Sequence, residues 1–187
     1  MPRVISHAHF EACQEDADRY MALLDRNQQA FDLSQRGELH AAEHMYRDIL
    51  HDKPAAGFDE MSIALTKNAL GCILRKLGKL DEAMELLQDA LDVRERYEEQ
   101  SGDSKIEDSW VTRDEIAKVY EAHGDCAMAL QTRVPGKRIC SSEGCKATGF
   151  DKLHGCSRCK CVFYCDKSCQ MDDWKRHKPL CKPSTAP

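Results

Sequence analysis

The sequence predicts an all-α helical-repeat domain of about three hairpins, followed by a small cysteine-rich module with a short β-hairpin and one helix. Segments that begin with glycine and share one spacing recur through the first 134 residues, and eight of the eleven cysteines fall in the last 48. Pro135 and Gly136 separate the two regions. A chain of 187 residues has room for one ordinary domain and a small module.

The repeat becomes visible when three segments are aligned: GELHAAEHMYRDIL from Gly37, GKLDEAMELLQDAL from Gly78 and GDCAMALQTR from Gly124. Each begins with a glycine, which suits a turn between two helices. A small residue stands five positions after each glycine, where antiparallel helices approach closely: Ala42, Ala83 and Ala129. One hairpin cannot bury its apolar stripe alone, whereas three stacked hairpins give a continuous core.

Apolar periodicity and helix breakers predict six helices, at 8–36, 38–51, 59–77, 80–100, 107–123 and 125–133. Asp59 is the predicted N-cap of the third helix, and Gly102 is the stop signal of the fourth. Helical spacing places these residues in the core: Met21, Leu24, Ala30, Leu33, Leu65, Leu70, Leu74, Leu87 and Ile116. The last helix is short and would leave apolar surface uncovered, so we expect the C-terminal module to pack there.

This pattern resembles the tetratricopeptide repeat (TPR), including Pro54 where that repeat usually ends. The glycine spacings of 41 and 46 residues are longer than usual and are similar to the lengthened repeats of kinesin light chains. The resemblance implies a concave groove for a peptide, although a scaffold that only presents the following module explains it equally well. Members that grip a C-terminal carboxylate use Lys and Asn on the groove helices. Here the corresponding positions do not form that clamp: Asn27, Phe31, Val111 and Glu115.

The C-terminal segment has the spacing of metal ligands. It reads Cys140-x4-Cys145-x10-Cys156-x2-Cys159-x5-Cys165-x3-Cys169-x7-His177-x3-Cys181. Seven cysteines and one histidine make two sets of four, the number of donors that a structural Zn²⁺ site uses. The N-terminus lacks the apolar core of a secretory signal. Metal-bound thiolates in a reducing compartment, cytoplasmic, nuclear or both, are therefore favoured over a disulfide knot.

The run CSRCKCVFYCDKSCQMDDWKRHKPLC resembles a MYND-type zinc finger, and the resemblance implies two cross-braced zinc ions per chain. One ion would be held by Cys140, Cys145, Cys165 and Cys169. The other would be held by Cys156, Cys159, His177 and Cys181. The first pair is spaced x4 where x2 is commoner, and Cys161 is a spare thiol that could replace Cys159. RING and PHD fingers fit less well, because their histidine comes earlier among the ligands.

The predicted domains are a repeat domain at 1–134, a linker at 135–139, the zinc finger at 140–181 and a tail at 182–187. Within the finger, alternation from Lys160 to Tyr164 predicts a short strand, and Asp166 can cap a helix that runs through His177. The finger has few large apolar residues, so bound metal must supply its folding free energy, on the order of 10 kcal/mol per zinc. Removal of zinc is expected to unfold 140–181 and leave the helical region formed.

Gln170 and Trp174 are four residues apart and share a helix face. A glutamine beside an indole, near an exposed strand edge, can bind an extended proline-containing peptide. In corepressor-type MYND modules, which this segment resembles, residues matching Ser157, Gln170 and Trp174 line such a groove. The alternative is that Trp174 belongs to the core and shields the second zinc, and one indole could do both.

Charge does not favour nucleic acid as the partner. Residues 137–182 carry a formal +6 and residues 1–136 a formal −11. Seven zinc-bound thiolates and two zinc ions reduce the finger's charge to about +3. The basic residues near the C-terminus are expected to form a solvated face: Lys175, Arg176, Lys178 and Lys182. No apolar run approaches the ~20 residues needed to cross a bilayer.

The sequence therefore predicts a non-enzymatic adaptor, in which a TPR-like scaffold presents a zinc-bound peptide-binding module. A fragment or accessory of a MYND-containing SET-type lysine methyltransferase is the main alternative. Such an enzyme needs a β-rich catalytic domain, which no segment here resembles. A nucleic-acid or transcription-associated zinc-binding regulator is a further alternative. A metalloenzyme would need an open zinc position, which two complete sets of four ligands do not leave.

Overall fold

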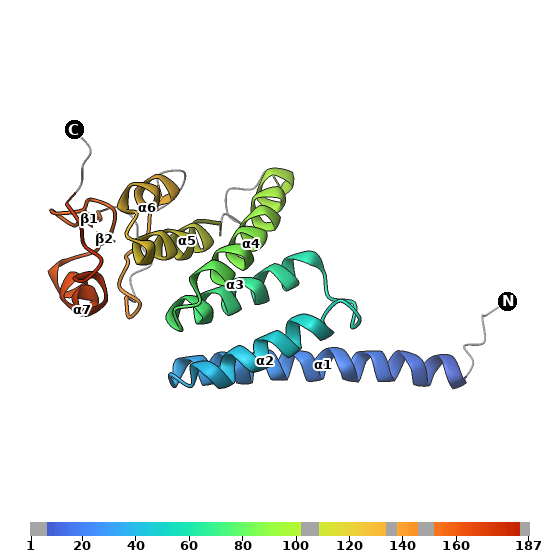
Figure 1. Ribbon diagram of the computed structural model, residues 1–187. Coiled ribbons are helices and arrows are strands. Elements are labelled where there is room, and N and C mark those ends of the chain that lie inside the picture. Colours follow the sequence, from blue (N-terminus) through green and yellow to red (C-terminus); the bar gives the residue numbers. More distant parts are fainter. Residues whose placement is uncertain (1–6, 102–108, 134–137, 146–151, 184–187) are drawn as a thin grey trace. The chain divides into compact units, whose positions relative to one another are not determined.

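The computed structural model describes residues 7–101, 109–133, 138–145 and 152–183 (Figure 1). Within these ranges the chain forms seven helices and two short strands. They are α1 (His7–Gln35), α2 (Leu39–Asp52), α3 (Glu60–Lys76), α4 (Leu80–Ser101), α5 (Ser109–His123), α6 (Cys126–Arg133), β1 (His154–Gly155), β2 (Phe163–Tyr164) and α7 (Lys167–His177). The chain divides into two compact units, Met1–Lys79 and Leu80–Pro187. The predicted fold class, helical repeats followed by a small zinc module, is confirmed.

The six helices of the repeat region lie where the sequence predicts them. Every described end of α1–α4 and α6 is within one residue of the prediction. The predicted start of the fifth helix at 107 and the stop signal Gly102 lie outside the described residues. Asp59 caps α3 as predicted, because its Oδ1 accepts a hydrogen bond from the Ser62 amide at 2.7 Å.

The three repeat glycines take the same backbone conformation. Gly37, Gly78 and Gly124 have φ of 79°, 78° and 81°, a region that residues with a side chain adopt only at a cost. At each turn the glycine amide donates to the carbonyl three residues back, and the next amide donates to the carbonyl five back. This paired arrangement closes the end of a helix, so the sequence repeat is also a repeat of turn geometry.

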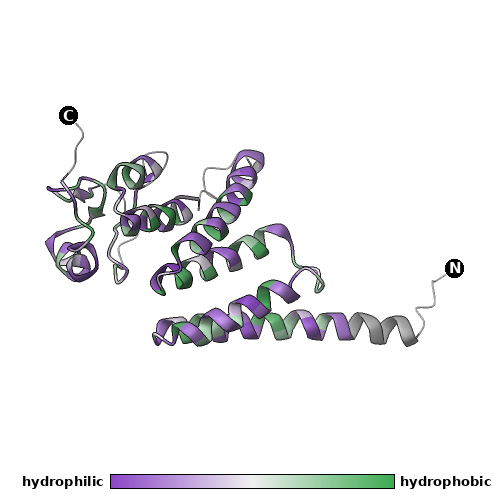
Figure 2. Ribbon diagram, viewed as in Figure 1, coloured by the Kyte–Doolittle hydropathy of each residue, from purple (hydrophilic) through white to green (hydrophobic). Residues whose placement is uncertain are grey.

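In the first unit, α2 packs against both α1 and α3. Figure 2 shows hydrophilic and hydrophobic residues interspersed along each helix, as expected where one face is buried. The core of this unit consists of Leu23, Ala30, Ala42, Tyr46, Ile49, Phe58, Ala64, Leu70, Ile73 and Leu74. Tyr20 of α1 stacks on Phe58, two residues before α3, with ring centroids 4.0 Å apart.

Three of the predicted core residues are wrong. Met21, Leu24 and Leu65 are 57%, 41% and 47% exposed, and Leu33 is only half-buried. The buried face of α1 instead runs through Leu23 and Ala30. Periodicity could not select this face, because several neighbouring residues of α1 are apolar. The other predicted core residues are buried: Ala30, Leu70, Leu74, Leu87 and Ile116.

In the second unit, α5 packs against α4 and α6, and the zinc segment shares a core with the α5–α6 hairpin. Ala117 of α5 and Ala129 of α6 are fully buried in this core. The finger contributes Cys156, Cys159, Cys161, Val162, Tyr164 and Cys181. The expectation that the C-terminal module packs on the last helix is confirmed. The segment that joins them, 134–137, lies outside the described residues.

The finger itself contains a two-stranded antiparallel sheet and α7. In the sheet, His154 is opposite Tyr164 and Gly155 is opposite Phe163. The strand expected at 160–164 is shorter than predicted, because Lys160 takes a positive φ of 62° and turns the chain. Cys161 to Tyr164 are all buried, so the apparent alternation did not reflect one exposed face. Asp166 caps α7 as predicted, accepting from the Cys169 amide at 2.9 Å.

Candidate metal centre

The first group of donors consists of half-buried cysteines on turns and on the first turn of α7. Cys140 lies in irregular chain, Cys145 ends a turn, and Cys165 directly follows β2. Cys169 lies on α7, where the Asp166 cap fixes the start of the helix. The four Sγ atoms lie within 4.8 Å of one another. The structure thus brings together Cys140, Cys145, Cys165 and Cys169, including the one from the unusual x4 spacing.

The second group consists of buried residues. Cys156 follows β1, Cys159 lies in the turn before β2, His177 ends α7 and Cys181 comes four residues later. Their donor atoms also lie within 4.8 Å of one another. The ligand order along the chain is interleaved, since the second group takes the third, fourth, seventh and eighth donors. This is the cross-braced arrangement that the MYND resemblance implies.

Distances between the donors fit tetrahedral zinc. A Zn–S bond of ~2.3 Å places two thiolates of a tetrahedron about 3.8 Å apart, and a thiolate and an imidazole nitrogen slightly closer. Cys145 Sγ and Cys165 Sγ are 3.5 Å apart in the first group. In the second, Cys156 Sγ and Cys181 Sγ are 3.8 Å apart, and Cys159 Sγ is 3.4 Å from His177 Nε2. The residues present therefore fit one zinc ion in each group.

Cys161 lies beside the second group but is not one of its four donors. Its Sγ donates a hydrogen bond to Cys159 Sγ at 3.5 Å. This hydrogen bond, opposed by burial and aided by His177, lowers the pKa of the Cys159 thiol to about 3, and the same contact raises the pKa of Cys161. The donor geometry therefore selects Cys159, and not Cys161, as the metal ligand.

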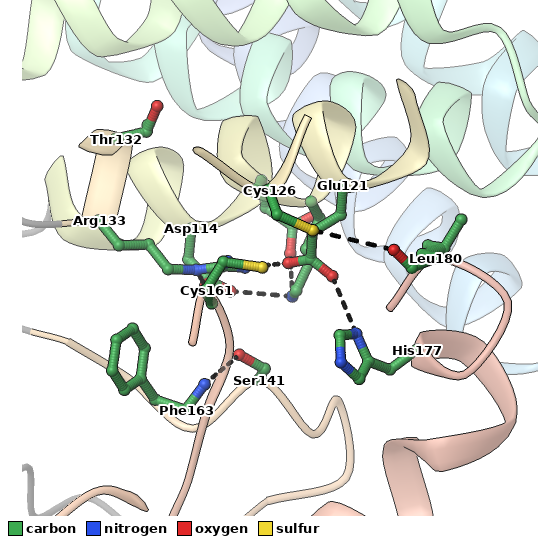
Figure 3. Close-up of polar contacts among 12 residues, drawn as sticks. Asp114, Glu121, Cys126, Thr132, Arg133, Ser141, Cys161, Phe163, His177 and Leu180 are labelled. Carbon is green, nitrogen blue, oxygen red and sulfur yellow. Dashed lines mark hydrogen bonds and ion pairs between the residues drawn. The ribbon is translucent and has the colours of Figure 1, made fainter. Parts of the chain in front are cut away.

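A buried ionic network joins the second metal group to the α5–α6 hairpin (Figure 3). Glu121 of α5 accepts from Arg133 Nη2 at 2.6 Å and from Arg176 Nη1 at 2.9 Å. Arg133 of α6 also donates to Asp114 Oδ1 at 2.7 Å and to the carbonyl of Cys161 at 2.5 Å. Burial alone would raise the pKa of Glu121, but His177 and the two arginines outweigh it and lower that pKa.

Sequence reasoning missed this network. Glu121 and Arg133 lie in a region interpreted from the sequence as a scaffold or a peptide groove, and Arg176 is expected in a solvated basic face. That assignment is wrong, because Arg176 donates to both Asp173 oxygens at 2.6 and 2.7 Å as well as to Glu121. Tyr164 Oη in turn donates to Asp173 Oδ2 at 2.7 Å. Only the contact across 55 positions reveals the role of Glu121, and no local pattern predicts it.

The three predicted partner-binding residues lie on two elements of the finger. Ser157 is exposed in the turn that follows β1, Gln170 is half-buried on α7, and Trp174 is 39% exposed. The Trp174 ring lies 6.1 Å from the ring of His177, at an angle of 58°. Trp174 therefore covers a metal ligand on one side and meets solvent on another. Met171, one turn earlier and 66% exposed, adds an apolar surface that the sequence analysis did not predict.

Comparison with known families finds one match in the C-terminal finger and one in the helical region. Residues 140–181 match the MYND finger, and residues 63–98 match a tetratricopeptide repeat. MYND fingers bind zinc, so the family match and the two donor groups confirm zinc as the cofactor. Both kinds of module generally mediate protein–protein interactions.

Similar curated proteins match only over short stretches. N-lysine methyltransferase SMYD2 of Homo sapiens is 52% identical over 36 residues, which are 19% of this chain and 8% of that protein. Histone-lysine N-methyltransferase Smyd1 of Mus musculus is 52% identical over 31 residues, 17% and 6% of the two chains. Egl nine homolog 1 of Homo sapiens is 46% identical over 41 residues, 21% and 10%.

The matched segments thus span a tenth or less of these relatives' own lengths. No solved structure matches the chain. Among the described residues, no helix is both long enough and apolar enough to cross a membrane.

Proposed function

We propose that this chain is a non-enzymatic adaptor whose MYND finger binds proline-containing peptides of partner proteins, while its TPR-like helices present the finger. The observation that carries the proposal is the exposed indole of Trp174, with Gln170 one turn before it and Met171 beside it on α7. Exposed aromatic side chains on a rigid element are typical of binding hot spots. Cys169 and His177 belong to the two donor groups, so bound zinc would hold α7 near both of its ends.

The composition of the metal groups supports the non-enzymatic part of the proposal. Each group supplies four protein donors, which is the arrangement of structural zinc, whereas catalytic zinc keeps a position for water or substrate. The relatives that are named methyltransferases share only a short stretch with this chain. The proposed role of zinc is therefore to hold α7 and the β-hairpin in place.

One strand edge is better suited than the other to pair with a peptide. The Ser141 amide donates to the Phe163 carbonyl at 2.8 Å, and Ser141 Oγ accepts from the Phe163 amide at 3.3 Å. These contacts occupy the edge of β2 that β1 leaves open. His154 and Gly155 of β1 are exposed, so we propose the outer edge of β1 for an extended peptide.

The charge around the α7 surface favours a peptide that also carries acidic residues. Lys167, Lys175 and Lys178 are exposed, and none of them forms an ion pair with any described residue. Lys167, Met171, Trp174 and Lys178 follow one another at helical spacing, so a lysine stands at each end of the apolar pair. Acidic residues on either side of a proline would meet these ammonium groups.

The test uses the zinc-loaded full chain on an array of proline-containing peptides with and without flanking Asp and Glu. Trp174→Ala should weaken the best peptide roughly thirty-fold, the effect of losing a hot-spot aromatic. Tyr97→Ala is the matched control, because Tyr97 is 37% exposed on α4. Zinc content, measured on both variants, should stay at the wild-type value.

Equal binding by the Trp174 variant and wild type would contradict the proposal and leave Trp174 only its contact with His177. Binding to acidic peptides should weaken as salt rises, whereas binding to their neutral counterparts should change little. Methyl transfer from S-adenosylmethionine by the purified chain would contradict the non-enzymatic part.

A further inference from the structure

The two nitrogens of His177 face different parts of the molecule. Nε2 faces the second donor group, 3.4 Å from Cys159 Sγ. Nδ1 faces α5, where the Glu121 carboxylate oxygen Oε2 is 3.7 Å away (Figure 3). When Nε2 binds a metal, the neutral imidazole keeps its proton on Nδ1, and that proton needs an acceptor.

Nδ1 of His177 is a buried nitrogen that makes no hydrogen bond to any described residue. The Glu121 carboxylate is the acidic group placed within ion-pair range of it. An adjustment of about half an ångström would bring the two atoms into hydrogen-bond range. A buried donor and a buried acceptor that face each other at this distance indicate a contact that forms when the ligand is held by its metal.

Glu121 is itself held in place by one residue of the α5–α6 hairpin and one residue of the finger. Its side chain has no exposed surface, and Arg133 of α6 and Arg176 of α7 each donate to a different carboxylate oxygen. One arginine comes from the helical hairpin and the other from the finger. The carboxylate therefore stays ionised in a buried position and cannot turn away from His177 without breaking two charged hydrogen bonds.

We propose that Glu121 is a positioning residue for the second metal site: from α5 it accepts the Nδ1 proton of His177, fixes the imidazole for metal binding, and makes the α5–α6 hairpin a part of the finger's folding unit. A carboxylate that orients a metal-bound histidine in this way typically raises metal affinity 10- to 100-fold. In this chain the carboxylate comes from the repeat region, outside the 140–181 segment that matches the MYND finger.

The test is a double-mutant cycle in the full chain, with zinc affinity at each site measured by competition with a chelator. Glu121→Gln should lower the zinc affinity of the second site 10- to 100-fold and leave that of the first site unchanged. His177→Cys replaces the imidazole with a thiolate donor and removes the Nδ1 proton. In that background, Glu121→Gln should no longer change zinc affinity, because no proton remains for residue 121 to accept.

A purely structural role for Glu121, as counter-ion of the two arginines, predicts a different result. The same loss of zinc affinity from Glu121→Gln in both backgrounds would overturn the proposal, as would no loss in either. The matched control is Asp172→Asn, which removes an exposed carboxylate from α7 and should leave both affinities unchanged.

A second readout observes His177 directly. In the zinc-loaded wild type, NMR of the imidazole should show an Nδ1-bound proton that exchanges slowly with water, and Glu121→Gln should shift it and speed its exchange. An unchanged signal would overturn the proposal. If the Gln variant does not fold, as judged by circular dichroism, the same cycle and spectrum are measured with Glu121→Asp, which keeps the charge but shortens the reach.

Discussion

At the scale of single residues, Glu43 resembles Glu121, because each is a buried carboxylate that accepts hydrogen bonds from two cationic side chains. Its side chain is 9% exposed, and Oε1 accepts from Lys79 Nζ at 2.6 Å and from Arg47 Nη2 at 2.8 Å. The hydrogen bond from Lys79 and then that from Arg47 lower the pKa of Glu43, against the opposing effect of burial. Glu43 joins α2 to the turn after α3, so its charge stabilises the first unit.

Glu43→Gln should therefore destabilise the first unit by about 1 to 3 kcal/mol at neutral pH. Because the folded pKa is lowered, this stabilisation is complete above the unfolded pKa of ~4.3 and disappears as the pH falls through the folded value. Urea unfolding of both proteins between pH 7 and pH 3 should show the difference shrink towards zero. Zinc loss in acid affects both proteins alike and cancels. A difference independent of pH would contradict the charge-based explanation.

At the scale of elements, the two metal groups differ in how they are enclosed. The four ligands of the first group are half-buried on turns and the start of α7. All four of the second are buried, and its three cysteines belong to the core shared with α5 and α6. A chelator reaches a zinc ion by attacking its ligands from solvent. The second site is also covered, on the side that faces α5 and α6, by the ionic network of Glu121 and Arg133.

We expect release of zinc to a chelator in two phases, with the first group emptied before the second. Stopped-flow detection with a zinc-sensitive dye should resolve them. Assignment uses Cys145→Ser, which should speed the fast phase and leave the slow phase unchanged. A single phase, or an effect of Cys145→Ser on the slow phase, would show that burial does not control release.

Helix ends and metal donors could be predicted from the sequence, whereas contacts between elements could not. Helix ends were predictable because each repeat turn uses a glycine with positive φ. The division of the eight donors into two sets was predictable because the segment resembles a MYND finger, whose ligands alternate in pairs between two ions. The buried face of α1 was not, since Met21, Leu23 and Leu24 are all apolar and only contact with α2 selects Leu23. The partnership of Glu121, Arg133 and Arg176 depends on tertiary packing and has no local signal.

At the scale of the whole molecule, the division into compact units does not follow the division into repeats and finger. The second unit contains α4, α5 and α6 together with the zinc segment, and its core draws on both. The first unit, with α1, α2 and α3, has a core of its own. Loss of metal should therefore affect part of the helical region, whereas sequence alone predicts that only 140–181 unfolds.

Hydrogen exchange with and without a chelator measures how far the effect of metal loss extends. Without zinc, amides of α5 and α6 should lose protection together with those of the finger, because Ala117 and Ala129 belong to the same buried core as Cys156, Val162 and Tyr164. Amides of α1, α2 and α3 should keep their protection, since the core of the first unit contains no metal ligand. Full protection of α5 and α6 in the metal-free chain would show that the hairpin folds independently of the finger. Loss of that protection would instead mean that zinc stabilises the end of the repeat array as well as the finger.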